Sequence, residues 1–211
     1  MLASASPARR RLLQAAGIEP EVLVSGIDES KVEAASPEEL CLSLARLKAR
    51  TVARRIRETE EPADPTLVLG CDSVLAFDGE ILGKPADAAD ATKRWLRMRG
   101  RSGVLHTGHC LISLGRQAAE DREVAAVAAT TVHFAAISEA EIADYVATGE
   151  PLQVAGAFTI DGLGGPFIER IEGDPGTVVG LSLPLLRTLL ADLGIPISEL
   201  WSEQVRPPRL G

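Results

Sequence analysis

An acidic residue lies inside an apolar stretch that has the composition of a buried strand. Residues 67–76, LVLGCDSVLA, are rich in Leu, Val and Ala and carry Asp72 near their middle. Carboxylates are rarely buried unless they are paired or functional. Asp72 is therefore the first candidate for a catalytic group or a metal ligand.

A lysine follows the same stretch at a distance that a β-hairpin brings close. Asp78-Gly79 is a strong signal for a two-residue turn. In the register that this turn sets, Ser73 faces Lys84, which places Lys84 diagonal to Asp72 and within its reach. The pattern predicts that a carboxylate and an ammonium meet at one end of the hairpin. They form either a structural ion pair or part of a site.

Two hydroxyl residues, Ser4 and Ser6, precede the first expected helix, and an arginine lies in its first turn. Ser6 suits the N-cap and Pro7 the first helical position. Helix N-termini bind anions through free N–H groups, and Arg9 can fold back and fork onto a phosphate. An ordinary N-cap followed by a solvated basic face is the alternative interpretation.

Acidic residues also stand at two other turns. Asp28 and Glu29 follow a short strand expected at 21–25. They are either solvated loop acids or hard oxygen ligands for Mg²⁺ or Mn²⁺. Asp161 opens a glycine-rich turn at 161–165, which by itself is typical of an ordinary turn and matches neither the P-loop nor the dinucleotide fingerprint.

The elements that must position these residues follow from periodicity, capping boxes and turn signals. Helices are expected at 7–16, 36–57, 86–99, 138–148 and 183–193. Strands are expected at 1–5, 21–25, 67–76, 80–82, 104–114, 123–137, 155–160 and 167–171, and a loop at 60–65. Because strands and helices mix without strict alternation, the pattern predicts an α/β or α+β fold with a mixed sheet, in one or two lobes.

Composition narrows the class of protein. The chain has 211 residues, 45% of them apolar, and a net charge of −8. That charge argues against non-specific binding to nucleic acid, which needs a basic surface. The sequence contains no run of 18 apolar residues, the length that a membrane-spanning helix needs. The cysteines are expected to be reduced core residues of a cytosolic protein: Cys41, Cys71 and Cys110. The histidines are expected to be structural and hydrogen-bonded: His106, His109 and His133.

Lysine is scarce in this chain. Only four of its 22 basic residues are lysines, and the rest are arginines. The four are Lys31, Lys48, Lys84 and Lys93. Where lysine persists, a compact point charge can be specifically needed.

Six motifs in order resemble those of the Maf family of nucleoside triphosphate pyrophosphatases. They run from residue 2 to about residue 195 and read LASASPARRRLL, DES, LARLKA, CDSVLAFDGEILGKPAD, TGEPLQVAGAFTIDGLGG and GLSLPLL. The resemblance implies an α/β fold similar to the ITPase-like proteins, with a mixed sheet flanked by helices and two lobes around a deep cleft. We therefore expect one domain over residues 1–200 and a C-terminal tail over 201–211.

The resemblance also implies a chemistry. Family members hydrolyse nucleoside triphosphates to a monophosphate and pyrophosphate with a divalent cation, Mg²⁺ or Mn²⁺. They are usually homodimers, are thought to cleanse the nucleotide pool, and have been tied to arrest of septum formation. We therefore expect a cytoplasmic homodimer that binds a nucleoside triphosphate. We expect it to bind neither nucleic acid nor a membrane.

The motifs carry over a set of site residues. Asp72 matches the catalytic acid, which either deprotonates the attacking water or ligates the metal that does. The substrate-binding set is Ser4, Ser6, Arg9, Lys48 and Asp161, with Lys84 beside Asp72 in the catalytic set. The expected metal ligands are Asp72 and Glu29.

Three positions depart from the family pattern. Ala8 and Val154 stand where many members have basic residues, and Asp161 stands where many have glutamine. Val154 and Asp161 are more similar to the branch associated with 7-methyl-GTP than to the one favouring dTTP and UTP. A carboxylate accepts hydrogen bonds and cannot donate one to a pyrimidine carbonyl, whereas it suits the N–H edge of guanine. The two missing basic residues support an alternative, a nucleotide-binding regulator of cell division with little hydrolysis.

Overall fold

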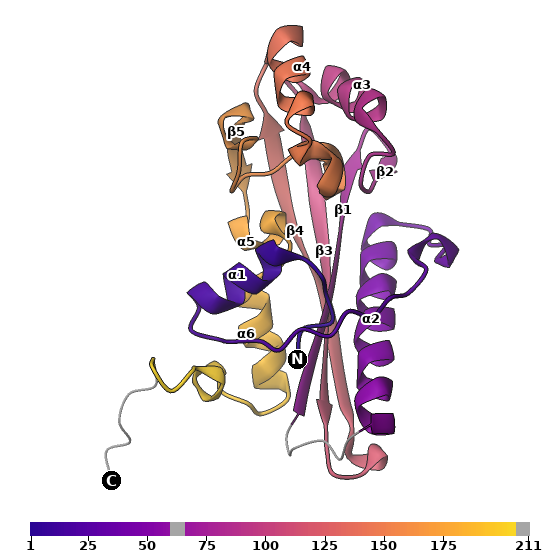
Figure 1. Cartoon of the computed structure of the whole chain (residues 1–211), viewed down its shortest axis with the longest axis vertical. Helices are drawn as coiled ribbons and strands as arrows, with labels where there is room; N and C mark the ends of the chain where they lie inside the picture. The colour runs from indigo at the N-terminus through magenta and orange to yellow at the C-terminus, as the bar shows by residue number, and fades with distance from the viewer. Residues whose placement is uncertain (60–65, 206–211) are drawn as a thin grey trace.

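A five-stranded sheet with three long strands runs through the protein (Figure 1). The computed structural model describes residues 1–59 and 66–205. The strands are β1 (Thr66–Phe77), β2 (Glu80–Leu82), β3 (Ser102–Leu114), β4 (Arg122–Phe134) and β5 (Ile168–Glu172). Their order in the sheet is β2-β1-β3-β4-β5, and each neighbouring pair is antiparallel. The expected hairpin is confirmed, since Phe77 pairs with Glu80 and Leu75 with Leu82.

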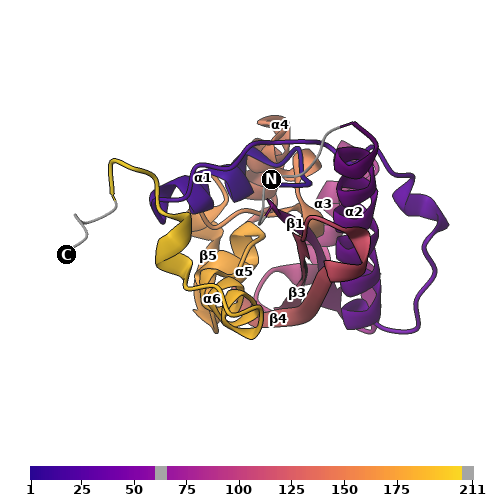
Figure 2. The same ribbon diagram turned by 90° about the horizontal axis from the view of Figure 1, so that it is seen from below.

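Helices cover both faces of this sheet. They are α1 (Pro7–Ala15), α2 (Pro37–Thr59), α3 (Ala88–Met98), α4 (Glu139–Ala147), α5 (Pro175–Val179) and α6 (Leu183–Asp192). The long helix α2 lies on one face, and α1, α5 and α6 lie on the other (Figure 1 and Figure 2). Helices α3 and α4 pack together at one end of the long strands (Figure 1). The α/β class is thereby confirmed.

Two glycines let α2 approach the sheet closely. A Cβ atom on Gly70 of β1 would lie 2.3 Å from the carbonyl oxygen of Ala45, and one on Gly108 of β3 would lie 2.3 Å from that of Cys41. Neither distance is possible for real atoms, so only glycine permits this contact. Because side chains alternate along a strand, Asp72 lies on the same face of β1 as Gly70 and faces α2.

The apolar core is divided among three clusters. One surrounds the fully buried Trp95 at the α3 and α4 end, where its ring lies edge-on to Phe134, Tyr145 and Phe167. A second lies between the sheet and helices α1 and α6, and a third between the sheet and α2. The second and third clusters therefore lie on opposite faces of the sheet. Cys41, Cys71 and Cys110 are free and buried, as expected.

The two N-terminal strands that the sequence predicts are reduced to single bridges. Leu2 pairs in parallel with Val22 and with Leu69 of β1, which gives the otherwise antiparallel sheet its mixed character. The segment is short because the chain leaves the sheet to enter α1, which begins at Pro7 with Ser6 as its N-cap.

The strand predicted at 155–160 is wrong. The chain forms a 3₁₀ turn at Ala155–Ala157, where Gly156 and Ala157 have φ values of 72° and 62°. That left-handed backbone is incompatible with a strand. The sequence interpretation also missed α5, although Asp174 and Pro175 are a standard N-cap pair.

Some predictions fall on parts of the chain that the structure does not cover. The loop expected at 60–65 and the last residues of the expected tail, 206–211, lie outside the described residues. Within the described ranges, every helix is too short or too polar to cross a membrane.

Candidate active site

The outer edge of β1 is paired at both ends and open between them. Residues 1–3 hydrogen-bond to β1 at Leu69, and β2 pairs with it from Leu75 onward. Between them, residues 70–74 have a backbone partner only on the β3 side, as far as the described chain shows. Asp72 stands at the centre of this open segment, so its surroundings are side chains from other elements.

A lysine of α2 joins Asp72 to a second carboxylate. The Nζ atom of Lys48 lies 2.5 Å from Oδ1 of Asp72 and 2.7 Å from Oε1 of Glu29. The side chains of Lys48 and Asp72 are each 10% exposed, whereas that of Glu29 is 54% exposed. An ammonium has three donors, so one N–H of Lys48 stays available for a further acceptor.

Burial controls the protonation of Asp72. Removal from water raises the pKa of its carboxyl group, and the nearby charges of Lys48 and Arg9 pull the pKa down without cancelling the effect. The pKa therefore lies above the usual value for an aspartate. A carboxylate of this kind accepts a proton more readily than a solvated one, which suits a general base.

Arg9 is held in place by three separate hydrogen bonds. Its Nε donates to the carbonyl oxygen of Gly180 at 2.7 Å, Nη1 donates to Oγ of Ser4 at 3.0 Å, and Nη2 donates to Oγ of Ser73 at 3.1 Å. A guanidinium carries five N–H groups, so two have no acceptor among the described residues. Arg9 and Ser4 are both buried. The side chain thus folds back from α1 toward β1.

Hydroxyl groups continue this network across the sheet. Oγ1 of Thr107 donates to the carbonyl oxygen of Thr177 at 2.8 Å, so its only hydrogen is used. Ser73 must then donate to Thr107, 2.8 Å away, and accept from Arg9. The orientation of each group in the chain from Arg9 to α5 is thereby determined.

His109 ties β3 to the start of α6. The backbone N–H of Ser182 donates to Nε2 at 2.8 Å, so the ring hydrogen is on Nδ1, which donates to the carbonyl oxygen of Thr107 at 3.0 Å. Burial lowers the pKa of His109 to about 4, so the ring is neutral at neutral pH. The expectation of a hydrogen-bonded structural histidine is correct here and at His133, whose Nε2 lies 3.0 Å from Glu172.

His106 departs from that expectation. Its Nδ1 is buried without a hydrogen-bond partner and lies 3.5 Å from a carboxylate oxygen of Glu38. The ring is on the α2 face of β3, two residues from Gly108.

The predicted pairing of Lys84 with Asp72 is corrected by the structure, which brings Lys48 to Asp72 instead. Strand β2 ends at Leu82, so the hairpin register does not extend to Lys84. The Lys84 side chain is exposed and forms no ion pair with any described residue. Its backbone is held, because Arg94 donates to the carbonyl oxygen of Gly83 at 2.7 Å.

The remaining predicted substrate-binding residues lie around α1. Ser6 accepts a hydrogen bond from the backbone N–H of Arg9 at 3.4 Å. Asp161 lies 3.5 Å from Nη2 of Arg11, which links the glycine-rich turn to this helix. Ser4, Ser6, Arg9 and Asp161 are thus connected through one element, while Asp72, Lys48 and Glu29 form a direct cluster.

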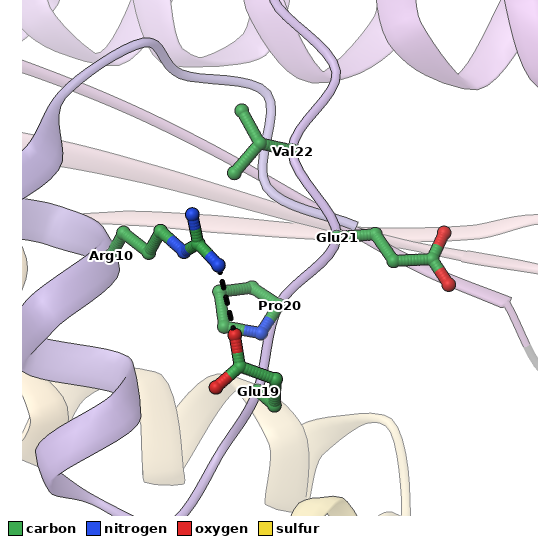
Figure 3. Close-up of a pocket in the computed structure, with 5 residues that line it drawn as sticks. All are labelled: Arg10, Glu19, Pro20, Glu21 and Val22. Carbon is green, nitrogen blue, oxygen red and sulfur yellow. Dashed lines mark hydrogen bonds and ion pairs between the residues drawn. The ribbon is translucent and has the colours of Figure 1, made fainter.

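The guanidinium of Arg10, two residues after Ala8, is paired with an acidic residue that is not in the predicted site. It lies 3.2 Å from Glu19 and faces a surface hollow of about 450 Å³ (Figure 3). The hollow is lined by Arg10, Glu19, Pro20, Glu21 and Val22. None of the predicted site residues lines it, so it is separate from the Asp72 cluster.

The donor set limits how a metal ion can bind. No three His, Cys, Asp or Glu side chains lie close enough to form a metal site within the described part of the chain. Asp72 and Glu29, however, lie near enough to share one ammonium. Mg²⁺ is commonly held by one or two carboxylates together with substrate phosphates, so this pair fits that mode.

Sequence reasoning missed two hydroxyl groups of the Arg9 network, those of Ser73 and Thr107. Ser73 follows Asp72 directly, but Thr107 lies 34 residues further along and is brought to it by the pairing of β1 with β3. No local signal predicts that register.

The fold and these residues define an α/β protein with a buried carboxylate, an ammonium and a guanidinium at an open strand edge. The family model described as Maf-like protein matches residues 1–193. The chain belongs to this family, as the resemblance indicated.

Several bacterial relatives are similar over nearly the whole chain, and each is called nucleoside triphosphate pyrophosphatase. The one from Salinispora tropica is 70% identical over 96% of this chain and 87% of its own length. Those from Streptomyces coelicolor and a Cyanothece species are 57% and 53% identical, and the matches cover 94% and 98% of their lengths.

Proposed function

We propose that this chain hydrolyses nucleoside triphosphates to nucleoside monophosphates and pyrophosphate. The observation that carries the proposal is the buried Asp72 carboxylate, 2.5 Å from Lys48, in a member of the Maf-like family. The activity is the one named for its relatives at up to 70% identity.

The cationic groups have the task of binding the triphosphate. A triphosphate carries about four negative charges, which must be offset before a nucleophile can approach. Arg9 offers two free N–H groups and Lys48 offers one. The exposed Lys84 adds a charge that no described residue neutralises. The N-terminus of α1, with Ser4 and Ser6, completes the predicted phosphate site.

Asp72 is the proposed general base. Its carboxylate takes a proton from a water molecule, and the water oxygen forms a bond to the α-phosphorus. The bond between that phosphorus and the bridging oxygen breaks, and pyrophosphate leaves. The raised pKa of Asp72 favours this proton transfer, and the hydrogen bond from Lys48 holds the carboxylate in a fixed orientation.

Asp72 and Glu29 are the residues that would hold a divalent cation, Mg²⁺ or Mn²⁺. When bound, such an ion supplies charge neutralisation at the phosphate oxygens. Lys48 bridges the same two carboxylates, so a bound cation would share them with its ammonium.

Asp161 is the proposed base-reading residue. Its carboxylate is 37% exposed and its contact with Arg11 is loose, at 3.5 Å. Exposed ion pairs of this kind contribute little free energy, so a nucleobase can take the place of the arginine. A carboxylate favours the N–H edge of guanine and the positive charge of a methylated purine, as in 7-methyl-GTP, over dTTP or UTP.

Pyrophosphate release from a nucleotide panel tests the proposal. The panel contains the four standard NTPs, dTTP, ITP and 7-methyl-GTP, each with Mg²⁺, Mn²⁺ or EDTA. We expect metal-dependent release that falls on the order of 100-fold or more in Asp72→Asn. Asp161→Gln should shift the preference toward pyrimidines, and unchanged selectivity would exclude its role as base reader.

A folded protein that binds nucleotides without turnover would favour the alternative, a regulator of septum formation and cell division. Full activity in a folded Asp72→Asn variant would instead remove Asp72 from the mechanism. Circular dichroism of both proteins separates a loss of chemistry from a loss of fold.

The oligomeric state, cellular location and domain bounds of the protein stay predictions. A homodimer in the cytoplasm, with one domain over 1–200 and a tail over 201–211, follows from the family resemblance. Sedimentation of the purified chain measures its oligomeric state directly.

A further inference from the structure

The glycine-rich turn that carries Asp161 is built around a carboxylate from another segment, Glu150. Oε1 of Glu150 accepts hydrogen bonds from the backbone N–H of Gly164 at 3.0 Å, from Oγ1 of Thr159 at 2.6 Å and from the Tyr145 hydroxyl at 3.0 Å. Oε2 accepts from the backbone N–H of Leu163 at 3.0 Å. Four donors on one carboxylate hold the turn from inside.

The same carboxylate explains why the turn consists of glycines. A Cβ on Gly162 would lie 2.5 Å from Oε2 of Glu150, and a Cβ on Gly164 would lie 2.4 Å from the hydroxyl oxygen of Tyr145. A side chain at either position would therefore push the Glu150 or Tyr145 group out of its hydrogen bonds. The turn and its carboxylate form one unit.

Electrostatics keep this unit ionised. Burial raises the pKa of Glu150, but hydrogen bonds from Thr159, Leu163 and Gly164 lower it by more, so the pKa lies below the usual value. Hydrogen bonds to an ionised acceptor are about twice as strong as those between neutral groups. The hydrogen bonds to Glu150 therefore stabilise this turn more than bonds to a neutral acceptor would.

The glycine-rich turn determines where the Asp161 carboxylate lies. Asp161 precedes the two bound N–H groups by two and three residues, and its carboxylate reaches Arg11 of α1. Helix α1 also carries Arg9, which lies in the Ser4 and Ser73 network. A shift of the turn would move Asp161 relative to the proposed phosphate site.

We infer that Glu150 is the positioning residue that fixes Asp161 and thereby sets the base selectivity of the site. The inference rests on the proposed function. Glu150 has no role in contacting the substrate, because its carboxylate oxygens are occupied by four hydrogen bonds within the protein. Its effect should appear in the discrimination between bases and not in the chemistry at the α-phosphorus.

Glu150→Gln is the informative substitution. A glutamine of the same shape keeps one oxygen for the three donors at Oε1, but its NH₂ group then faces the Leu163 N–H, donor against donor. We expect the ratio of kcat/KM between the best purine and the best pyrimidine nucleotide to fall about tenfold, which corresponds to about 1.4 kcal/mol. The change should be in KM, with kcat for the best nucleotide altered by less than about threefold.

Two controls separate positioning from general loosening. Glu141→Gln changes another hydrogen-bonded carboxylate, one that accepts from the N–H and hydroxyl of Ser138 in a helix cap, and should leave the ratio unchanged. Ribose 5-triphosphate, which lacks a base, should be hydrolysed equally by wild type and Glu150→Gln. If Glu150→Gln does not fold, Tyr145→Phe removes one of the four donors and should lower the ratio in the same direction.

The outcomes are distinct. A lower ratio with unchanged hydrolysis of the base-free substrate supports the inference. An unchanged ratio, or an equal loss on ribose 5-triphosphate, overturns it while leaving the pyrophosphatase intact. Absence of turnover by the wild type on every nucleotide refutes the proposed function and this inference with it.

Discussion

One buried histidine should make the folding stability of this protein depend on pH. The neutral ring of His109 accepts a hydrogen bond from Ser182 and donates one to Thr107, and burial lowers its pKa from 6.5 to about 4. In the unfolded chain the ring titrates near its ordinary value. Between these two pH values the unfolded state binds a proton that the folded state does not, so stability falls as the pH falls.

The size of the effect follows from the two pKa values. The contribution of the neutral ring is fully present above pH 6.5 and is lost progressively as the pH falls toward about 4. Within this window each pH unit removes up to about 1.4 kcal/mol, so a change from pH 6.5 to about pH 5 should cost about 2 kcal/mol. That is a large part of the stability of a typical domain.

Urea unfolding measures this loss, with the fluorescence of the fully buried Trp95 as one reporter. The comparison protein is His109→Gln, whose amide oxygen can accept from Ser182 but does not titrate. Other groups titrate equally in both proteins, so the difference between their slopes isolates His109. Equal slopes between pH 6.5 and about pH 5 would refute the assignment of a neutral, hydrogen-bonded ring.

Three further substitutions test the site and its support. Lys48→Met leaves the buried Asp72 without its partner and should destabilise the fold by about 3 kcal/mol in chemical denaturation, whereas the double variant Lys48→Met/Asp72→Asn should recover part of the loss. Gly108→Ala places a Cβ 2.3 Å from the carbonyl oxygen of Cys41 and should lower the free energy of unfolding by about 2 kcal/mol. Gly83→Ala serves as its control, because a Cβ at that position meets nothing within 4 Å. Lys84→Ala should change the free energy of unfolding by less than about 0.5 kcal/mol but lower the rate of pyrophosphate release. Lys93→Ala is the control and should leave the rate unchanged. If Lys84→Ala also leaves the rate unchanged, Lys84 is not part of the site.

The parts of the fold that local sequence determines were predictable. The Asp78-Gly79 turn gave the correct hairpin register, and the Ser138 capping box gave the correct start of α4. In both cases the interacting residues lie within a few positions of one another, so composition and spacing are sufficient.

The arrangement of the site depends on contacts between distant segments. Lys48 reaches Asp72 because Gly70 and Gly108 allow α2 to lie directly on the sheet. The small residues Cys41, Ala45 and Ala49 of α2 face these glycines, but which strands they meet depends on the tertiary fold. The pairing of Lys84 with Asp72 was predicted by extending the hairpin register past Leu82, where the strand ends. His109 meets Ser182 across 73 residues, which no local pattern encodes.

The open segment of β1 has a consequence for self-association. An unpaired strand edge is a template onto which a second chain can add by backbone hydrogen bonding, and charged side chains directed inward at such an edge oppose that addition. Residues 70–74 form such an edge, and the charges of Asp72 and Lys48 lie within it. We therefore expect the groups that are proposed to act on a nucleotide also to oppose edge-to-edge aggregation. A chain in which both are replaced by apolar residues should aggregate more readily than the wild type.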